Sequence, residues 1–163
     1  MKKLIAALFL IIFTGSLASA QVWSSIDYKY SNGPVSPKYQ KSYIISVSTD
    51  RYVTLTYTSN TDGAKSDSYS RKLSKSQMRK FNKKLNASGF LDINYTPNFT
   101  DNMKVGGSTK NITINYSGKR MPLELNERLG DKGELEQFES LAAYMEKLIP
   151  AKVMKKFNSG TTE

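Results

Sequence analysis

The sequence contains no cysteine and no histidine among its 163 residues. Without cysteine, the chain has neither disulfides nor a thiol nucleophile. Without histidine, it lacks the Ser-His and Cys-His catalytic systems and the usual zinc ligands. It has no P-loop and no G-x-G-x-x-G motif, and no Ser or Thr has a Lys three residues later. We therefore expect a protein that is not an enzyme and that binds no cofactor or metal.

Paired carboxylates, as in glycoside hydrolases, are the catalytic alternative that these absences leave open. The acids before residue 124 are scattered singly, and only Asp92 and Asp101 form a pair worth testing. The acids of the last helical segment fit a different role, because carboxylates near a helix N-terminus favour its dipole and solubility.

The first twenty residues have the three parts of a secretory signal. Lys2 and Lys3 precede an apolar run, and Ala18-Ser19-Ala20 is a small-residue cleavage site. The run of ten apolar residues is too short for a membrane-spanning helix, which needs about 20. We predict cleavage after Ala20 and export to the periplasm or the medium. An exported chain of this size without disulfides suggests a bacterial envelope protein.

Charge of one sign dominates: the net charge is +10, and it is +8 once Lys2 and Lys3 are removed. The excess of Lys and Arg lies before residue 124, whereas acids outnumber bases after it. This asymmetry predicts one basic face that attracts acidic partners. Because we expect export, nucleic acid is not an expected partner, and anionic lipid, acidic glycan or an acidic protein is.

Apolar residues alternate with polar ones in several short segments, the pattern of half-buried strands. The predicted strands cover residues 22–31, 42–48, 52–59, 111–116 and 119–125, with shorter ones at 68–73 and 91–95. Pro122 places the strand of residues 119–125 at a sheet edge. Strands occur as hairpins before each helix, which predicts the α+β class: an antiparallel sheet of about four to six strands with two helices packed on one face.

Two helices are predicted, at residues 75–88 and 131–149. For the first, Ser74 and Gln77 form an S-x-x-Q capping box, and Gly89 suits the left-handed position after the last turn. The second ends at Pro150. We expect a single domain over residues 21–150 and a basic C-terminal tail over residues 151–163. The tail either packs on its own domain or lies on a membrane surface.

The candidate binding residues fall in two groups. The first is the basic side of the helix at residues 75–88, and the second lies in the irregular segment of residues 96–110. The charges of this helix spread around its exposed arc, which favours an ordinary solvated face over a concentrated docking site. The two groups are Lys75, Arg79, Lys80, Lys83 and Lys84 in the helix, and Asp101 and Lys104 in the irregular segment.

The order of these motifs resembles small exported bacterial domains of the emfourin type. The shared features are an early Asn-Gly turn, an S-x-x-Q helix ending in SGF, an I-x-I-x-Y-x-G-K strand and a final L-x-x-F-x-x-L helix. The chain departs from that pattern in having a signal peptide and a single Gly33 where a glycine pair is expected. The resemblance implies a small sheet with helices and a peptidase-inhibitor type of function, with no inhibitory residue carried over.

Our first functional hypothesis is an exported, non-enzymatic binding protein that engages another envelope or secreted protein, as a peptidase inhibitor would. Its contacts would come from the loops at residues 31–40 or 96–110. The alternative is an envelope-surface binder that holds anionic lipid or polysaccharide through the basic helix.

Overall fold

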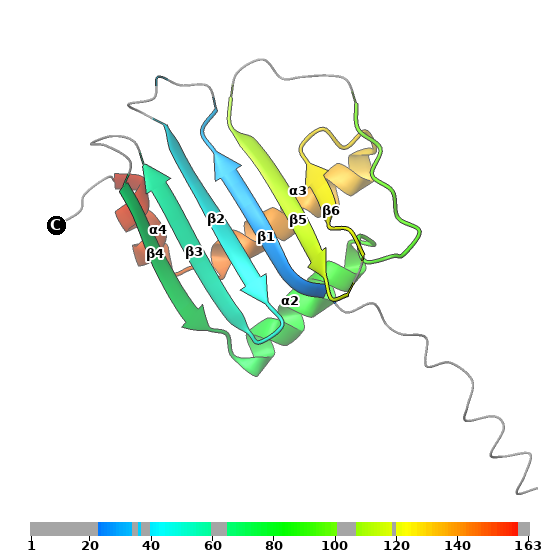
Figure 1. Cartoon of the computed structure of the whole chain (residues 1–163), viewed down its shortest axis with the longest axis horizontal. Coiled ribbons are helices and arrows are strands. Elements are labelled where there is room, and N and C mark those ends of the chain that lie inside the picture. The colour runs from blue at the N-terminus through cyan, green and yellow to red at the C-terminus, as the bar shows by residue number, and fades with distance from the viewer. Residues whose placement is uncertain are drawn as a thin grey trace, which may run out of the picture.

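The computed structural model describes residues 23–33, 36, 40–59, 65–100, 107–118 and 120–159. Within these residues the chain forms one six-stranded antiparallel sheet and three helices, which confirms the predicted α+β class (Figure 1). The elements are β1 (Trp23–Ser31), β2 (Lys41–Ser48), β3 (Tyr52–Ser59), β4 (Lys65–Lys72), α2 (Lys75–Ala87), β5 (Thr109–Tyr116), β6 (Leu123–Asn126), α3 (Lys132–Lys147) and α4 (Ala151–Ser159).

The strands lie in the order β4-β3-β2-β1-β5-β6. The first four form a meander, and β5 then pairs with the free side of β1. The short strand β6 lies at one edge, directly after Pro122, as predicted. The strand predicted at residues 119–125 begins later than expected, at Leu123, and Met121 before it is exposed rather than part of the inward face.

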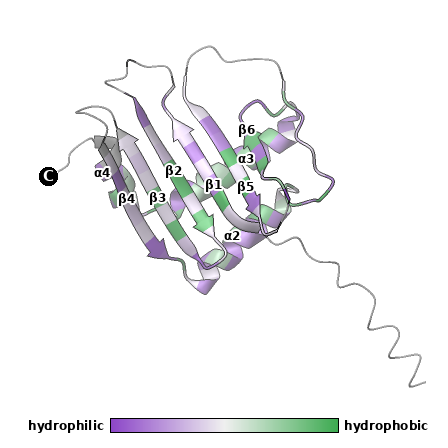
Figure 2. Cartoon of the chain, viewed as in Figure 1, coloured by the Kyte–Doolittle hydropathy of each residue, from purple (hydrophilic) through white to green (hydrophobic). Residues whose placement is uncertain are grey.

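One face of the sheet holds the core, and all three helices lie on that side (Figure 1). Alternate residues of β1, β2, β3 and β5 point into the core, so hydrophobic and hydrophilic residues alternate along these strands (Figure 2). Phe81 and Leu85 of α2 and Phe138 and Leu141 of α3 are buried in the same cluster. The alternation that predicted the strands therefore also identified their inward face.

Helix α2 begins and ends where the sequence predicts. The Ser74 side chain accepts a hydrogen bond from the Gln77 backbone N–H at 3.1 Å, and the Ser74 backbone N–H donates to Gln77 Oε1 at 3.0 Å. Gly89 has a φ of +77°, a left-handed conformation that glycine adopts without strain. The residues that begin and end α2 all lie within or next to the helix, which explains why the sequence alone was enough to locate it.

The predicted strand at residues 91–95 is wrong. These residues form turns, and Ile93 is 69% exposed. Asp92 Oδ1 accepts a hydrogen bond from the Asn94 backbone N–H at 2.8 Å, a local bond that competes with strand pairing.

Strand β4 extends further than the short strand predicted at residues 68–73. It pairs with the whole of β3, although its sequence is rich in serine.

The last two helices follow each other around Pro150. Arg71 of β4 donates two hydrogen bonds to the carbonyl oxygen of Leu148, at 2.6 and 3.2 Å, and so caps the C-terminal end of α3 with a positive charge. Beyond Pro150, the segment predicted as a tail is helical as far as Ser159, and Val153 and Met154 of α4 pack against the core.

Candidate functional site

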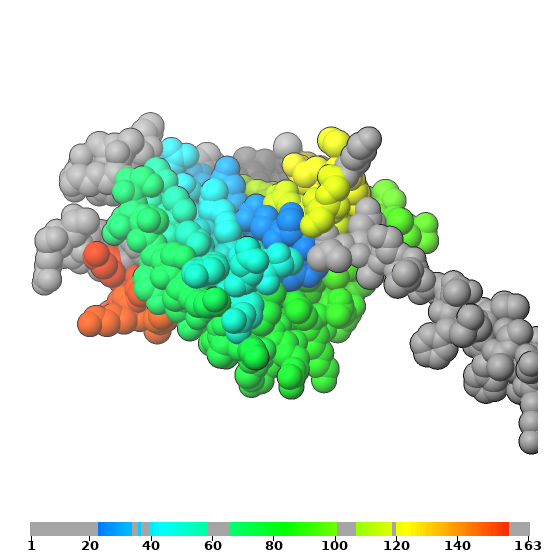
Figure 3. Space-filling view, turned by 60° about the horizontal axis from the view of Figure 1, so that its bottom comes forward, coloured from blue at the N-terminus to red at the C-terminus, as the bar shows by residue number. Residues whose placement is uncertain are grey.

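Four cations of α2 project from the outside of the molecule and form what we call the basic surface: Lys75, Arg79, Lys80 and Lys83. All four are exposed, and none makes a hydrogen bond or ion pair with another described residue. Helix α2 itself contains no acid. In the space-filling view α2 lies in green along the lower side of the molecule, with α4 in orange beside it at the left (Figure 3). The charge of this helix is therefore directed to solvent or to a partner.

Lys84, predicted with the same group, has a different position. It is half-buried, and its Nζ donates a hydrogen bond to Ser140 Oγ of α3 at 2.6 Å. This bond joins the two helices that cover the sheet. We therefore assign Lys84 to helix packing and leave it out of the basic surface.

The second predicted group, Asp101 and Lys104, lies outside the described residues. The irregular segment is shorter than predicted, because β5 already begins at Thr109. Its first part is fixed to the turn before α3: the Thr100 N–H donates to the Arg128 carbonyl oxygen at 2.8 Å, and the Gly130 N–H donates to the Asn98 carbonyl oxygen at 2.8 Å. In the loop at residues 31–40, Asn32 accepts from the Lys41 backbone N–H at 2.9 Å through its side chain.

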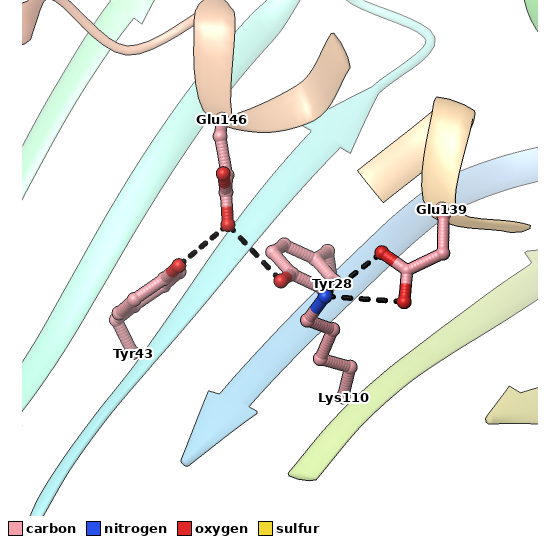
Figure 4. Close-up of polar contacts among 5 residues, drawn as sticks. All are labelled: Tyr28, Tyr43, Lys110, Glu139 and Glu146. Atoms are coloured by element: carbon pink, nitrogen blue, oxygen red, sulfur yellow. Dashed lines mark hydrogen bonds and ion pairs between the residues drawn. The ribbon is translucent and has the colours of Figure 1, made fainter. Parts of the chain in front are cut away.

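The sequence did not predict the polar cluster between the sheet and α3. Tyr28 of β1 and Tyr43 of β2 both donate their hydroxyl hydrogens to the same carboxylate oxygen, Glu146 Oε1, at 3.0 and 2.7 Å (Figure 4). Tyr30 stacks on Tyr43 with the ring centroids 4.9 Å apart. Two adjacent central strands are thus fastened to the helix by one acid.

The environment of this cluster keeps both tyrosines protonated. Burial raises the pKa of Tyr28 and Tyr43 above the ordinary value, and the negative charge and hydrogen bond of Glu146 raise these pKa values further. A phenol with a raised pKa is a poor proton donor and does not form the phenolate nucleophile at neutral pH. The cluster is therefore arranged to hold the fold together.

A second acid of α3 also reaches the sheet. Lys110 Nζ of β5 lies 2.8 and 3.1 Å from the two oxygens of Glu139 (Figure 4), and the hydrogen bond to Glu139 raises the pKa of Lys110. The interpretation of the acids of this helix as dipole and solubility residues is therefore wrong for Glu139, and Glu146 has a structural role as well. One feature of the sequence could have indicated these contacts: Glu139 and Glu146 border the apolar stripe of the helix. Their partners, however, lie in strands far away in the sequence.

Among the described residues, no group of three or more acids is placed to hold a metal ion. The described helices include none with the length and hydrophobicity needed to cross a membrane. No protein-family model matches this chain, and the search of curated proteins gives no significant match. The resemblance to emfourin-type domains therefore stays a prediction.

Proposed function

We propose that this protein is an exported, non-enzymatic binding protein that holds an anionic component of the bacterial envelope on its basic surface. The observation that supports the proposal is the set of four exposed α2 cations with no acidic partner among the described residues. Two sources offer the complementary charge: the phosphates of anionic lipids and the carboxylates of acidic glycans.

The rigidity of α2 supports this assignment. The helix is capped at its start, and its inner side is anchored in the core by Met78, Phe81 and Leu85. Lys84 is bonded to α3. The four exposed cations therefore extend from a fixed backbone, although each long side chain still loses rotamer freedom when it is bound.

The peptidase-inhibitor hypothesis remains the alternative. It depends on the loops at residues 31–40 and 96–110, and residues 34, 35, 37–39 and 101–106 lie outside the described part of the chain. A stable complex with a secreted peptidase, lost when residues 100–108 are replaced, would favour that hypothesis over ours.

The test is binding of the purified protein to two anionic supports, vesicles of phosphatidylglycerol in phosphatidylcholine and alginate beads. Vesicles of phosphatidylcholine alone and neutral agarose beads are the controls. We expect binding at about 50 mM salt that weakens strongly at about 500 mM, because salt shortens the screening length. Binding to only one support identifies the source of the charge.

The key variant is Lys75→Gln, Lys80→Gln, Lys83→Gln. A basic side chain near an anionic membrane contributes roughly 1 kcal/mol, so three together predict a loss of about a hundredfold in affinity. Glutamine keeps the helix propensity of lysine. The matched control is Lys29→Gln, Lys132→Gln, Lys147→Gln, which removes the same charge from exposed positions outside α2. Equal losses in both variants would mean that net charge alone acts, and the proposal would then be abandoned.

A further inference from the structure

The face of the sheet opposite the helices carries mostly short polar side chains, and its few charges balance one another. We call it the open face. The strand pairing places the outward residues of the six strands in rows across it. One row runs Ser70, Thr54, Ser46, Asp27, Thr113 and Glu124; the next runs Ser68, Thr56, Ile44, Lys29, Asn111 and Asn126. Serine, threonine and asparagine dominate both rows.

The charge of the open face contrasts with that of the rest of the molecule. Its described charges are Asp27 and Glu124, balanced by Lys29 and Lys72, in a chain of net charge +10. On the helical side, α2 and α4 carry Lys and Arg and no acid, whereas most of the acids of this side lie in and just before α3. The open face therefore offers no net electrostatic attraction to a strongly anionic partner. A neutral partner meets no excess charge of either sign there.

The side chains of this face are short and partly fixed by one another. Asn115 Nδ2 donates to Ser25 Oγ at 2.9 Å and to Asp27 Oδ2 at 2.8 Å. Thr54 Oγ1 and Ser70 Oγ share a hydrogen bond of 3.1 Å. Such side chains lose less rotamer entropy on binding than Lys or Glu would. Hydroxyl groups recur at about 4.8 Å across the strands and about 6.7 Å along them.

Large apolar groups are few on the open face. Ile44 is 37% exposed near its middle, and Tyr52 is 46% exposed near one end, with Lys72 Nζ 5.5 Å from its ring centroid. The buried centre of a stable protein–protein interface is mainly apolar. A second copy of this chain, or another folded protein, would not find such a centre here.

We propose that the open face binds a neutral polysaccharide chain. Sugar hydroxyls are donors and acceptors, as are those of serine and threonine, so each polar group that loses water on contact finds a partner. Ile44 and Tyr52 offer the apolar surface for the C–H side of a sugar ring. This inference does not rest on the proposed function, because it concerns the opposite side of the sheet and a ligand without charge.

The test is co-sedimentation of the purified protein with insoluble cellulose, chitin and starch granules in about 500 mM salt, where long-range charge effects are screened. We expect retention on at least one of the three and release by soluble fragments of that polymer. The variant Ser46→Arg, Thr56→Arg places two long side chains on adjacent strands of the open face and is expected to weaken retention at least tenfold. The control Ser76→Arg, Asn86→Arg adds the same charge at exposed positions of α2 and is expected to bind normally.

A milder variant keeps the test independent of folding defects. Thr56→Val, Thr113→Val removes two hydroxyls while keeping the side-chain shape and a high strand propensity, and we expect about tenfold weaker binding. The proposal is overturned if none of the three polymers retains the protein, or if both open-face variants bind as the parent does. It is also overturned if the open face instead joins two copies of the chain, seen as a dimer that Ser46→Arg, Thr56→Arg dissociates.

Discussion

Replacing Glu146 with alanine tests the central polar cluster directly. The substitution removes the acceptor of two hydrogen bonds at once, from Tyr28 and Tyr43. These tyrosines are 1% and 8% exposed, so water does not easily replace the lost carboxylate. A hydrogen bond to a charged group contributes about 1.5–3 kcal/mol, and we therefore expect the free energy of unfolding to fall by about 3 kcal/mol.

The assay is equilibrium unfolding in urea, followed by the fluorescence of Trp23. This is the single tryptophan of the chain, and it packs edge-on against Phe81 in the core, with the ring centroids 5.8 Å apart. The matched control is Glu136→Ala, an exposed position of the same helix, where we expect a change within about 0.5 kcal/mol. Alanine favours the helix at both positions, so helix propensity does not explain a difference.

A double-mutant comparison separates the hydrogen bonds from other effects of Glu146. In a background that carries Tyr28→Phe and Tyr43→Phe, no hydroxyl is left to donate, and Glu146→Ala should destabilise the protein much less. If Glu146→Ala is as harmless as Glu136→Ala in the parent protein, or equally harmful in both backgrounds, the carboxylate is not acting as the shared acceptor.

Three further predictions concern the pH dependence of the same cluster and two other parts of the fold. Stability should fall above pH 10, because the raised pKa values of Tyr28 and Tyr43 keep them protonated when folded while unfolded tyrosine ionises near 10; the expected slope is about 1.4 kcal/mol per pH unit for each, and Tyr43→Phe should make the measured slope shallower. Ser74→Ala should lower the free energy of unfolding by about 1 kcal/mol in a urea titration, because the capping box is lost; an unchanged midpoint would contradict the role of the cap. Gly33→Ala should lower the melting temperature, because Gly33 has a φ of +79° and its new methyl group would meet the backbone of Gly107; an unchanged melting temperature would show that this contact can relax.

The sequence predicted the parts of this fold that depend on near neighbours. Helix α2 carries its start, its apolar side and its end within the stretch from Leu73 to Phe90, and each of these signals is found in the structure. The inward faces of β2 and β3 follow from alternation alone. The segment at residues 91–95 also alternates, but among the described residues no strand pairs with it, and it forms turns in which Asp92 accepts a hydrogen bond from the Asn94 backbone N–H.

Features that join distant residues were not predictable in this way. The acceptor of Tyr28 and Tyr43 is more than a hundred positions away in the sequence, and no residue near Glu146 identifies these two tyrosines as its partners. Strand β4 has few apolar residues of its own and is defined by its pairing with β3. The basic surface was predicted as a set of charges, yet only the packing of α2 shows that Lys84 turns toward Ser140 while the others stay exposed.

The position of β1 has a consequence for the order in which the sheet can assemble. This strand is the first of the six along the chain, yet it lies between β2 and β5. During synthesis, which starts at the N-terminus, β1 to β4 can pair one after another. The other side of β1 keeps unpaired backbone groups until residues 109–116 have been synthesised and form β5. An unpaired strand edge invites pairing with other chains, so the interval before β5 docks is the stage most exposed to aggregation or to capture by a chaperone.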